Sequence, residues 1–454
     1  MNLNNTVAAQ STPVGRGAIS MIRITGDDAV KIAAAVFKPK RGPLTEAGHA
    51  KAVYGDFVYG GVIDDGVATV YRAPKSYTGE DMVELCCHGG VLVTGLILKA
   101  LYEAGAAPAE GGDFTKRAFI NGKLRLSQAE AIMDIIDAES EAALRISGAS
   151  GRGKLSDETL GMYNELKHLI AATYAYIDYP DEDMTDVTVD EMKNSLSSLI
   201  DRAEKLKDSR KTSYAVCDGV QTVICGKPNA GKSSLLNLFT GKDTAIVTEI
   251  PGTTRDVIKD SVMCGDVKLR LCDTAGIRKT DDAVEKIGVQ RAISALSEAK
   301  LVLAVFDAKR PADEEDKAII SEISKLGCPV IAVINKIDED EYSEDYEGIS
   351  EYTVKLSAKT GQGKEELQKL IVDLFLQGGI NYDLPHIAND RQYAEIVRFI
   401  ASAKNALQTL EAGQTQDIAC LDLEDALAAL AELDGLEVTD DIVNEIFSKF
   451  CVGK

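Results

Sequence analysis

Three patterns of apolar and polar positions follow one another along the chain. In residues 1 to about 120, short runs alternate between apolar and polar residues and are separated by glycine turns, as in Ala18–Ile24, Gly66–Tyr71 and Met82–Cys86. An alternation of period two is typical of strands that bury one face. This part of the chain is therefore predicted to form a compact α+β or α/β domain.

In the second pattern, apolar residues recur every three or four positions, as in a helix that buries one face. The pattern runs from 127 to about 212 and is clearest in Gln128–Ile146. Helical spacing returns from Arg391 onward, with turns expected at Gly413 and Gly435. Both stretches are predicted to be all-helical.

The third pattern lies between these two helical stretches. From about Gly219 to Gly378, short apolar runs such as Val220–Cys225 and Ile331–Ile334 alternate with helical segments, as a doubly wound sheet requires. The economical interpretation is a multidomain α/β plus all-α chain, in which a helical domain is interrupted by an inserted α/β domain. We expect domain boundaries at 1–121, 122–218, 219–378 and 379–454.

Composition narrows the class of protein. The chain has 454 residues, enough for about three domains, and its formal net charge of -22 argues against a broad basic groove for nucleic acid. Nine cysteines without a C-x-x-C pair and four scattered histidines argue against a disulfide scaffold or a zinc site. The first five residues lack the features of a signal peptide, and no run reaches the roughly 18 apolar residues that cross a membrane. We expect a cytoplasmic protein with no membrane partner.

One motif carries the clearest chemistry. The segment Gly226–Ser233, GKPNAGKS, matches the phosphate-binding loop G-x-x-x-x-G-K-[ST] and lies between an apolar run and a helical segment. Its backbone N–H groups can cradle phosphate, Lys232 can reach the β- and γ-phosphates, and the Ser233 hydroxyl can bind Mg²⁺. The predicted phosphate contacts are Asn229, Ala230, Gly231, Lys232, Ser233 and Ser234.

Two later segments indicate which base is bound. Asn335-Lys336-Ile337-Asp338 follows a buried strand and resembles the guanine-specificity motif of the small-GTPase superfamily. The Asp338 carboxylate can accept two hydrogen bonds from guanine, whereas adenine has neither donor and would leave it unpaired. Ser357-Ala358-Lys359 resembles the last motif of that superfamily, in which a backbone N–H contacts the guanine oxygen. Alone, the first segment also fits a polar turn, but the order of the motifs favours a Ras-like GTPase domain.

Two segments between these motifs are predicted to sense the γ-phosphate. Asp273-Thr274-Ala275-Gly276 follows a strand-like run; in such a motif the aspartate holds Mg²⁺ through water and the glycine N–H meets the phosphate. The other segment is Thr248–Asp256, in which Thr254 is the candidate Mg²⁺ ligand. The predicted nucleotide and ion contacts there are Thr248, Glu249, Ile250, Pro251, Gly252, Thr253 and Thr254. GTP would order both segments, and hydrolysis would release them.

One absence is informative. The residue after the D-T-A-G motif is Ile277, where the best-known GTPases carry a glutamine that orients the attacking water. An isoleucine cannot hydrogen-bond water, so this function must come from elsewhere. Asn229 resembles the asparagine of GTPases that K⁺ activates, although the sequence equally allows a loop-capping role. The other ligands of such an ion would come from Thr248, Ile250 and Thr253.

Four further blocks resemble one family along the whole chain. They are Gly15–Ile19 with Ile22–Ile24, Ser76–Asp81 with Cys87–Gly90, Phe114–Phe119 with Asn121–Leu124 and Gln128–Ile132, and Phe450–Lys454. Together with the phosphate loop, they make the chain similar to the bacterial tRNA-modification GTPase MnmE (TrmE) family.

The resemblance implies a mechanism. The family is a homodimer joined through N-terminal domains, which bind a tetrahydrofolate derivative (formyl- or methylene-tetrahydrofolate) as one-carbon donor. With a flavoprotein partner, MnmG, in a heterotetramer, it adds an aminomethyl or carboxymethylaminomethyl group to the wobble uridine of certain tRNAs. K⁺-dependent pairing of two GTPase domains accelerates GTP hydrolysis, and the resulting movement is coupled to the modification.

The resemblance also assigns residues. The folate contacts would be Arg23, Glu80, Lys123 and Lys454. Without the resemblance each is an ordinary surface charge, an interpretation that spacing alone favours for Lys123. Glu285 matches the family glutamate that orients the hydrolytic water, and Cys451 would lie near the modification site. Taken alone, Cys451 fits a half-buried structural thiol.

Two other functions fit parts of the sequence. A ribosome-assembly GTPase switch shares the phosphate-loop asparagine and the hydrophobic residue after D-x-x-G, but usually carries a basic RNA-binding module. A chain that binds GTP only to scaffold a complex would not need the complete switch set. Net charge and domain order therefore favour the modifying enzyme.

Overall fold

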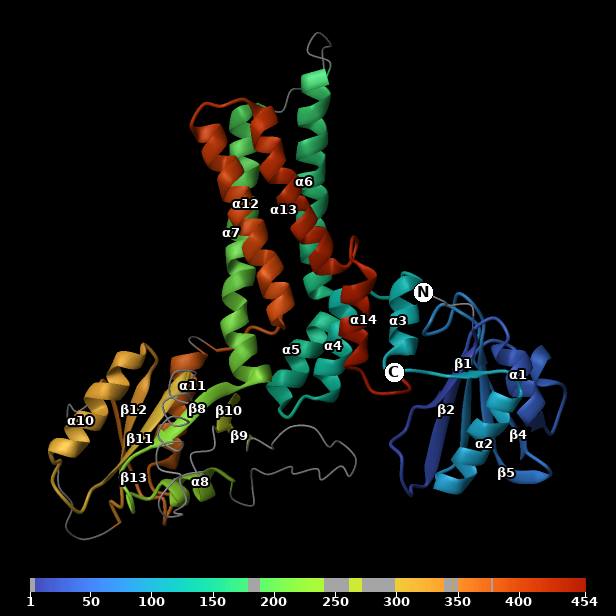
Figure 1. Ribbon diagram of the computed structural model, residues 1–454, viewed down its shortest axis with the longest axis horizontal. Helices are drawn as coiled ribbons and strands as arrows, with labels where there is room; N and C mark the ends of the chain where they lie inside the picture. Colours follow the sequence, from blue (N-terminus) through green and yellow to red (C-terminus); the bar gives the residue numbers. More distant parts are fainter. Residues whose placement is uncertain are drawn as a thin grey trace, which may run out of the picture. The chain divides into compact units, whose positions relative to one another are not determined.

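The computed structural model describes seven stretches of the chain. They are residues 5–178, 188–240, 261–271, 299–338, 346, 350–376 and 379–454. The chain divides into two compact units, the first comprising Met1–Met133, Ser150–Ala203 and Ala394–Lys454, and the second Asp134–Ala149 and Glu204–Tyr393. Figure 1 shows the elements of both.

The first unit begins with a seven-stranded sheet in the order β3-β4-β5-β6-β2-β1-β7. The strands are β1 Val7–Gln10, β2 Ile19–Thr25, β3 Phe37–Pro39, β4 Lys51–Val58, β5 Val62–Tyr71, β6 Met82–His88 and β7 Ala107–Pro108. Neighbours pair antiparallel except β1 and β7, which are parallel. The three alternating runs of the sequence become β2, β5 and β6, which confirms the strand prediction for them.

Two helices, α1 (Ala29–Val36) and α2 (Val91–Glu103), pack with this sheet (Figure 1). Ile22 and Leu85 from the strands, and Ile97 and Leu101 from α2, have no exposed surface. Each fully buried side chain of this size contributes about 2 kcal/mol of hydrophobic free energy. The alternation seen in the sequence therefore corresponds to one face of the sheet that turns toward these helices.

The rest of the first unit is helical. Its elements are α3 Asp113–Ile120, α4 Leu126–Ile136, α6 Lys154–Asp178, α7 Val189–Ser213, α12 Asp390–Glu411, α13 Gln416–Asp434 and α14 Asp440–Ser448, of which α4, α7 and α12 extend into the second unit. Helices α6 and α13 lie side by side (Figure 1). Arg202 of α7 contacts Glu165 of α6 at 2.9 Å, and Arg398 of α12 contacts Glu432 of α13 at 3.1 Å. None of the described helices is long and apolar enough to span a membrane.

The predicted helices are confirmed among the described residues, but one predicted helix is divided into two. The breaks expected at Gly413 and Gly435 separate α12, α13 and α14, and Gly435 adopts φ 78°, a left-handed conformation that favours glycine. The periodic segment Gln128–Ile146, however, is not continuous, because α4 ends at Ile136 and α5 (Glu141–Gly151) begins after a turn. Ser140 causes the restart, since its hydroxyl accepts a hydrogen bond from the Ala143 N–H at 3.0 Å and caps the new helix.

A buried carboxylate joins three helices of the first unit. Asp434, at the end of α13, has a side chain that is 1% exposed. It accepts hydrogen bonds from the Ser127 hydroxyl of α4 at 3.0 Å and the Ser156 hydroxyl of α6 at 2.8 Å, and Arg125 lies 3.5 Å away. Burial raises the pKa of Asp434, although the two hydroxyls oppose the shift. The packing of α4, α6 and α13 therefore includes a group whose charged form is disfavoured.

We predict that this group produces a measurable pH dependence of stability. The pKa of Asp434 in the folded state is raised above its ordinary value of 3.8. Between these two pKa values the folded state therefore binds more protons than the unfolded state. The stability that protonation of Asp434 contributes falls as the pH rises through this range. In Asp434→Asn the contribution is absent, so the stability of the variant relative to wild type should increase with pH. Chemical denaturation from about pH 4 to about pH 8 measures this difference. A difference that is constant with pH would contradict the prediction.

In the second unit the described strands form a six-stranded sheet in the order β13-β12-β11-β8-β10-β9. The strands are β8 Val220–Cys225, β9 Ser261–Cys264, β10 Val267–Leu271, β11 Leu301–Asp307, β12 Val330–Asn335 and β13 Tyr352–Leu356. All pairs are parallel except β9 with β10. The two predicted buried strands, β8 and β12, are confirmed, and so is the doubly wound α/β class of this part of the chain.

Helices cover both faces of this sheet. On one face, α8 (Lys232–Thr240) and α11 (Lys364–Phe375) bury Leu235 and Leu367 against the strands. On the other face, α10 (Glu314–Ile323) buries Ile320 and Ile323. The carboxyl ends of β8, β11, β12 and β13 lie at the same edge, where a doubly wound fold binds its ligand.

One arginine, Arg210, lies near the start of the segment Glu204–Tyr393 of the second unit and contacts the end of the same segment. Helix α7 continues into a π-helical turn at Tyr214–Asp218, and the chain returns to the helical stretch through Ala388 and Asp390. The Arg210 guanidinium lies 2.6 Å from Asp218 and 2.8 Å from Asp390, and donates to the Ala388 carbonyl at 2.8 Å. A single buried side chain therefore holds the departing and returning segments together.

Candidate functional site

The phosphate loop between β8 and α8 has a backbone that requires glycine at two positions. Gly226 adopts φ 141° and Gly231 adopts φ 101°. A Cβ on Gly226 would lie 2.2 Å from the Val305 carbonyl oxygen, and one on Gly231 would lie 2.0 Å from Nδ2 of Asn335. The loop is therefore pressed against β11 at its start and against the end of β12 near its finish, as a backbone cradle for phosphate requires.

The Lys232 ammonium faces back into this loop. It donates to the carbonyl oxygens of Gly226 and Lys227, each at 2.8 Å, and burial lowers its pKa. Neutral carbonyls are weaker partners for an ammonium than a phosphate anion would be. Ser233 and Ser234 lie in the first turn of α8, where the helix presents its free N–H groups. These residues fit a phosphate group.

Asn335 connects the phosphate loop to the segment predicted to contact the base. This residue is 2% exposed; its Nδ2 donates to the Ala230 carbonyl at 2.9 Å and its Oδ1 accepts from the Ala358 N–H at 2.9 Å. Lys336 donates to the Asn229 carbonyl at 2.7 Å and pairs with Asp307 at 2.6 Å. Three motifs far apart in sequence thus form one hydrogen-bonded assembly.

The Asp338 carboxylate is held at the edge of this assembly. The Ser357 hydroxyl donates to it at 2.7 Å, and the Lys359 ammonium lies 4.0 Å away. The hydrogen bond from Ser357 is the main cause that lowers the pKa of Asp338, so the group is ionised at neutral pH. An ionised, oriented carboxylate can accept the two guanine donors that the sequence suggested.

Some predicted residues lie outside the described residues. They are Thr248, Glu249, Ile250, Pro251, Gly252, Thr253, Thr254, Asp273, Thr274, Ala275, Gly276 and Glu285. Among the predicted ion ligands, Ser233 (Mg²⁺) and Asn229 (K⁺) are described, and Asn229 adopts φ 63° within the loop. The roles of all these residues stay predictions.

A second polar site lies in the N-terminal sheet domain. Nη1 of Arg117, whose side chain is 3% exposed, donates to both carboxylate oxygens of Glu80 at 2.9 and 3.1 Å. The Thr25 hydroxyl donates to the same carboxylate at 3.1 Å, and Nη2 of Arg117 donates to the Asn5 carbonyl at 2.9 Å. Glu80, a predicted folate contact, is therefore fixed in one orientation by a buried guanidinium.

Arg23 and Lys123, two further predicted folate contacts, have different neighbours. Arg23 pairs with Glu84 at 2.9 Å and lies over the ring of Tyr77, 5.6 Å from its centroid. The Tyr77 hydroxyl in turn bonds to the Thr115 hydroxyl at 2.9 Å. Lys123 donates to the Pro74 carbonyl at 3.1 Å, close to the loop that carries Glu80.

The last residues of the chain pack against the same domain. Val452 forms an antiparallel bridge with Gly111, and the Lys454 carbonyl accepts from the Phe114 N–H at 3.1 Å, at the start of α3. The Gly453 carbonyl accepts from the Ser11 hydroxyl at 2.9 Å. This packing brings the main chain of Lys454 to the helix that carries Arg117, while the Cys451 thiol is exposed.

Sequence reasoning missed two residues of this polar site, Arg117 and Glu84. A signal for Arg117 was available, because it lies among the apolar residues of α3, where a charged side chain needs a partner if it is buried. No local pattern identified Glu84 as the partner of Arg23.

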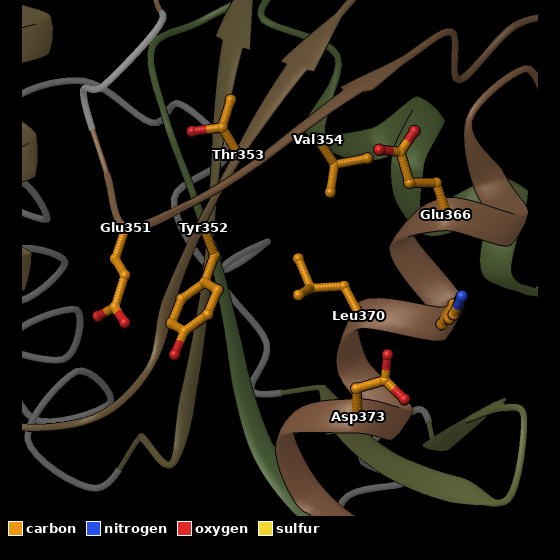
Figure 2. Close-up of a pocket in the computed structure, with 8 residues that line it drawn as sticks. Glu351, Tyr352, Thr353, Val354, Glu366, Leu370 and Asp373 are labelled. Carbon is orange, nitrogen blue, oxygen red and sulfur yellow. The ribbon is translucent and has the colours of Figure 1, made fainter.

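A pocket of about 280 Å³ lies elsewhere, between β13 and α11 (Figure 2). Three carboxylates, Glu351, Glu366 and Asp373, line it, with Lys369 as the opposing charge. Carboxylates repel phosphate, and none of the residues lining this pocket belongs to a nucleotide motif. The nucleotide motifs converge instead at the carboxyl ends of β8 and β12.

Comparisons with known proteins agree with these motifs. A family model described as "GTP-binding protein TrmE N-terminus" matches residues 6–123, and one described as "MnmE helical domain" matches residues 126–451. The chain is 37% identical over 462 residues to the tRNA modification GTPase MnmE of Acetivibrio thermocellus, with 100% of both sequences covered. It is 38% identical over 458 residues to that of Lactobacillus acidophilus, with 99% of this chain and 98% of the relative covered. The chain therefore belongs to the MnmE family of tRNA modification GTPases.

Proposed function

We propose that this chain binds and hydrolyses GTP and couples hydrolysis to modification of the wobble uridine of certain tRNAs. The proposal that the chain binds GTP rests on the two hydrogen bonds of the Asn335 side chain. One joins it to the phosphate loop and the other to the segment that follows Ser357. This arrangement fixes the distance between the phosphate cradle and the Asp338 carboxylate, and so suits a guanine nucleotide. The tRNA part rests on the family to which the chain belongs.

The modification we propose is addition of an aminomethyl or carboxymethylaminomethyl group, with a formyl- or methylene-tetrahydrofolate as one-carbon donor. A pterin offers donors to a carboxylate such as Glu80, and a glutamate tail offers carboxylates to Arg23, Lys123 or Lys454. The pairing of Glu80 with buried Arg117 supports the proposal, because a carboxylate held in one orientation is the acceptor that a pterin needs. A flavoprotein partner of the MnmG type would supply the redox chemistry, and the chain would act as a homodimer.

We propose that residues of the nucleotide-binding motifs bind Mg²⁺ and K⁺. Ser233 and Thr254 would hold Mg²⁺, and Asn229, Thr248, Ile250 and Thr253 would hold K⁺. Bound ions would neutralise charge on the phosphates. Glu285 would orient the hydrolytic water, since Ile277 cannot, and K⁺ would favour pairing of two GTPase domains. The proposed domain boundaries are 1–121, 122–218, 219–378 and 379–454, and the proposed compartment is the cytoplasm.

We predict that tRNA nucleosides report this function directly. In cells lacking the gene, aminomethyl-type wobble uridines should disappear and should return with the wild-type chain, as measured by mass spectrometry of tRNA nucleosides. Cys451→Ser should not restore them if the exposed thiol acts in the chemistry, whereas Cys328→Ser, a half-buried thiol of the GTPase unit, should. Unchanged nucleosides with accumulating ribosomal precursors would instead favour a ribosome-assembly switch.

A further inference from the structure

Four charged side chains form a cluster beside the phosphate loop. They are Lys227, from the first turn of the loop, Arg310 and Asp313, from the segment between β11 and α10, and Asp316, from the first turn of α10. The Asp316 side chain is 1% exposed and that of Lys227 is 15% exposed. Lys227 lies within the phosphate-loop motif, whereas Arg310, Asp313 and Asp316 belong to none of the nucleotide-binding motifs.

The two carboxylates are fixed by the start of α10. The Asp313 N–H donates to Asp316 at 3.2 Å and the Asp316 N–H donates to Asp313 at 3.0 Å, the reciprocal pattern of a capping box. Arg310 adds a bidentate pair to Asp316 at 2.7 and 3.0 Å. Both carboxylates are thus held in place by the fold around them.

Lys227 completes the cluster from the side of the loop. Its ammonium forms an ion pair with Asp313 and lies 3.5 Å from Asp316. With these partners Lys227 is not directed at a nucleotide, unlike Lys232, whose partners are loop carbonyls. The hydrogen bond from Lys227 lowers the pKa of Asp313 to about 2, so the Asp313 carboxylate is ionised at neutral pH.

The main chain of Lys227 is in direct contact with the lysine predicted to bind phosphate. Its carbonyl accepts one of the two hydrogen bonds from the Lys232 ammonium, at 2.8 Å. A phosphate anion competes for that ammonium and weakens this bond at the moment when the loop must keep its shape. The side chain of Lys227 does not depend on Lys232 and remains tied to α10.

We propose that Lys227, held by Asp313 and Asp316, is a positioning residue that keeps the first turn of the phosphate loop in place while Lys232 engages the nucleotide. The proposal rests on the proposed GTP binding and deepens it. Loss of the tie leaves the loop to be ordered by the nucleotide itself, which lowers affinity more than the rate of the chemical step.

The test compares variants of the full chain. Lys227→Met should weaken GDP binding, measured by titration calorimetry, by about tenfold, and should raise the KM for GTP similarly with kcat within about twofold of wild type. Lys227→Arg should restore affinity because it keeps the charge. Asp313→Asn retains a good helix cap and should weaken binding like Lys227→Met, and the double variant should be no worse than either.

Lys317→Met is the matched control, because Lys317 pairs with Glu314 at 3.3 Å on the exposed face of the same helix. Its GDP affinity should equal that of wild type. If Lys227→Met lowers the melting temperature but leaves GDP affinity unchanged, or if Lys317→Met has the same effect on affinity, the positioning role is wrong. A wild-type chain that binds no GDP would instead refute the proposed GTP binding itself.

Discussion

Replacing Asp338 by asparagine should lower kcat/KM for GTP by about 1,000-fold and shift the preference of the enzyme to XTP. The carboxylate can accept from both the ring N–H and the exocyclic amine of guanine, whereas an asparagine amide turns one acceptor into a donor. That donor faces the guanine amine and leaves buried polar groups unpaired, but it suits the carbonyl that xanthine has at the same position. Hydrolysis of GTP and XTP by the variant measures the switch.

The structure makes this prediction sharp, because Asp338 is already oriented by the Ser357 hydroxyl at 2.7 Å. Asp266→Asn, an exposed residue of the β9–β10 turn in the same unit, is the control and should leave both activities unchanged. If Asp338→Asn hydrolyses GTP as wild type does, or gains nothing with XTP, Asp338 does not bind the base.

Replacing Arg117 by methionine should destabilise the N-terminal domain by about 3 kcal/mol. Removing one member of a buried ion pair leaves the other charge without compensation, and among the described residues Glu80 would keep only the Thr25 hydroxyl as a donor, at 3.1 Å. The Asn5 carbonyl also loses its donor. Amide hydrogen exchange of β2 and β6, which flank this site, should become about 100-fold faster.

The control for this prediction is Lys31→Met, since Lys31 is 83% exposed and lies 3.6 Å from Asp28 on the surface of the same domain. Its exchange should match wild type, because exposed pairs contribute little. Unchanged exchange in Arg117→Met would show that the pair does not stabilise the sheet. Partial recovery in Arg117→Lys would support the charge as the cause.

Local patterns were sufficient wherever one segment carries its own signal. The strand Val220–Cys225 was predicted to the residue, because it is a short apolar run bounded by a turn and a glycine loop. The phosphate loop and the N-K-x-D motif were recognised from residue type and spacing, and the structure brings them together through Asn335. Parallel strands end at one edge of a sheet, so this convergence follows from the topology that the alternation predicted.

Contacts between distant residues left no such signal. Asp434 meets Ser127 and Ser156 across most of the chain, and nothing near Asp434 distinguishes it from an exposed acid at a helix end. The ion pair of Lys227 with α10 was missed for the same reason, since exposed lysine is the default. The break between α4 and α5 was missed because apolar spacing continued across it, while the Ser140 cap outweighed the pattern.

The position of Arg210 has a consequence for chain entropy. A long insertion between α7 and α12 would ordinarily have to be closed as a loop, at a cost that grows with the logarithm of its length. Here the segments that leave and rejoin the helical domain both contact the Arg210 guanidinium, which lies 2.6 Å from Asp218 and 2.8 Å from Asp390. Folding of the insert thus brings α7 and α12 within reach of each other, and the helical domain acquires α12 and α13 at the entropic cost of a short loop.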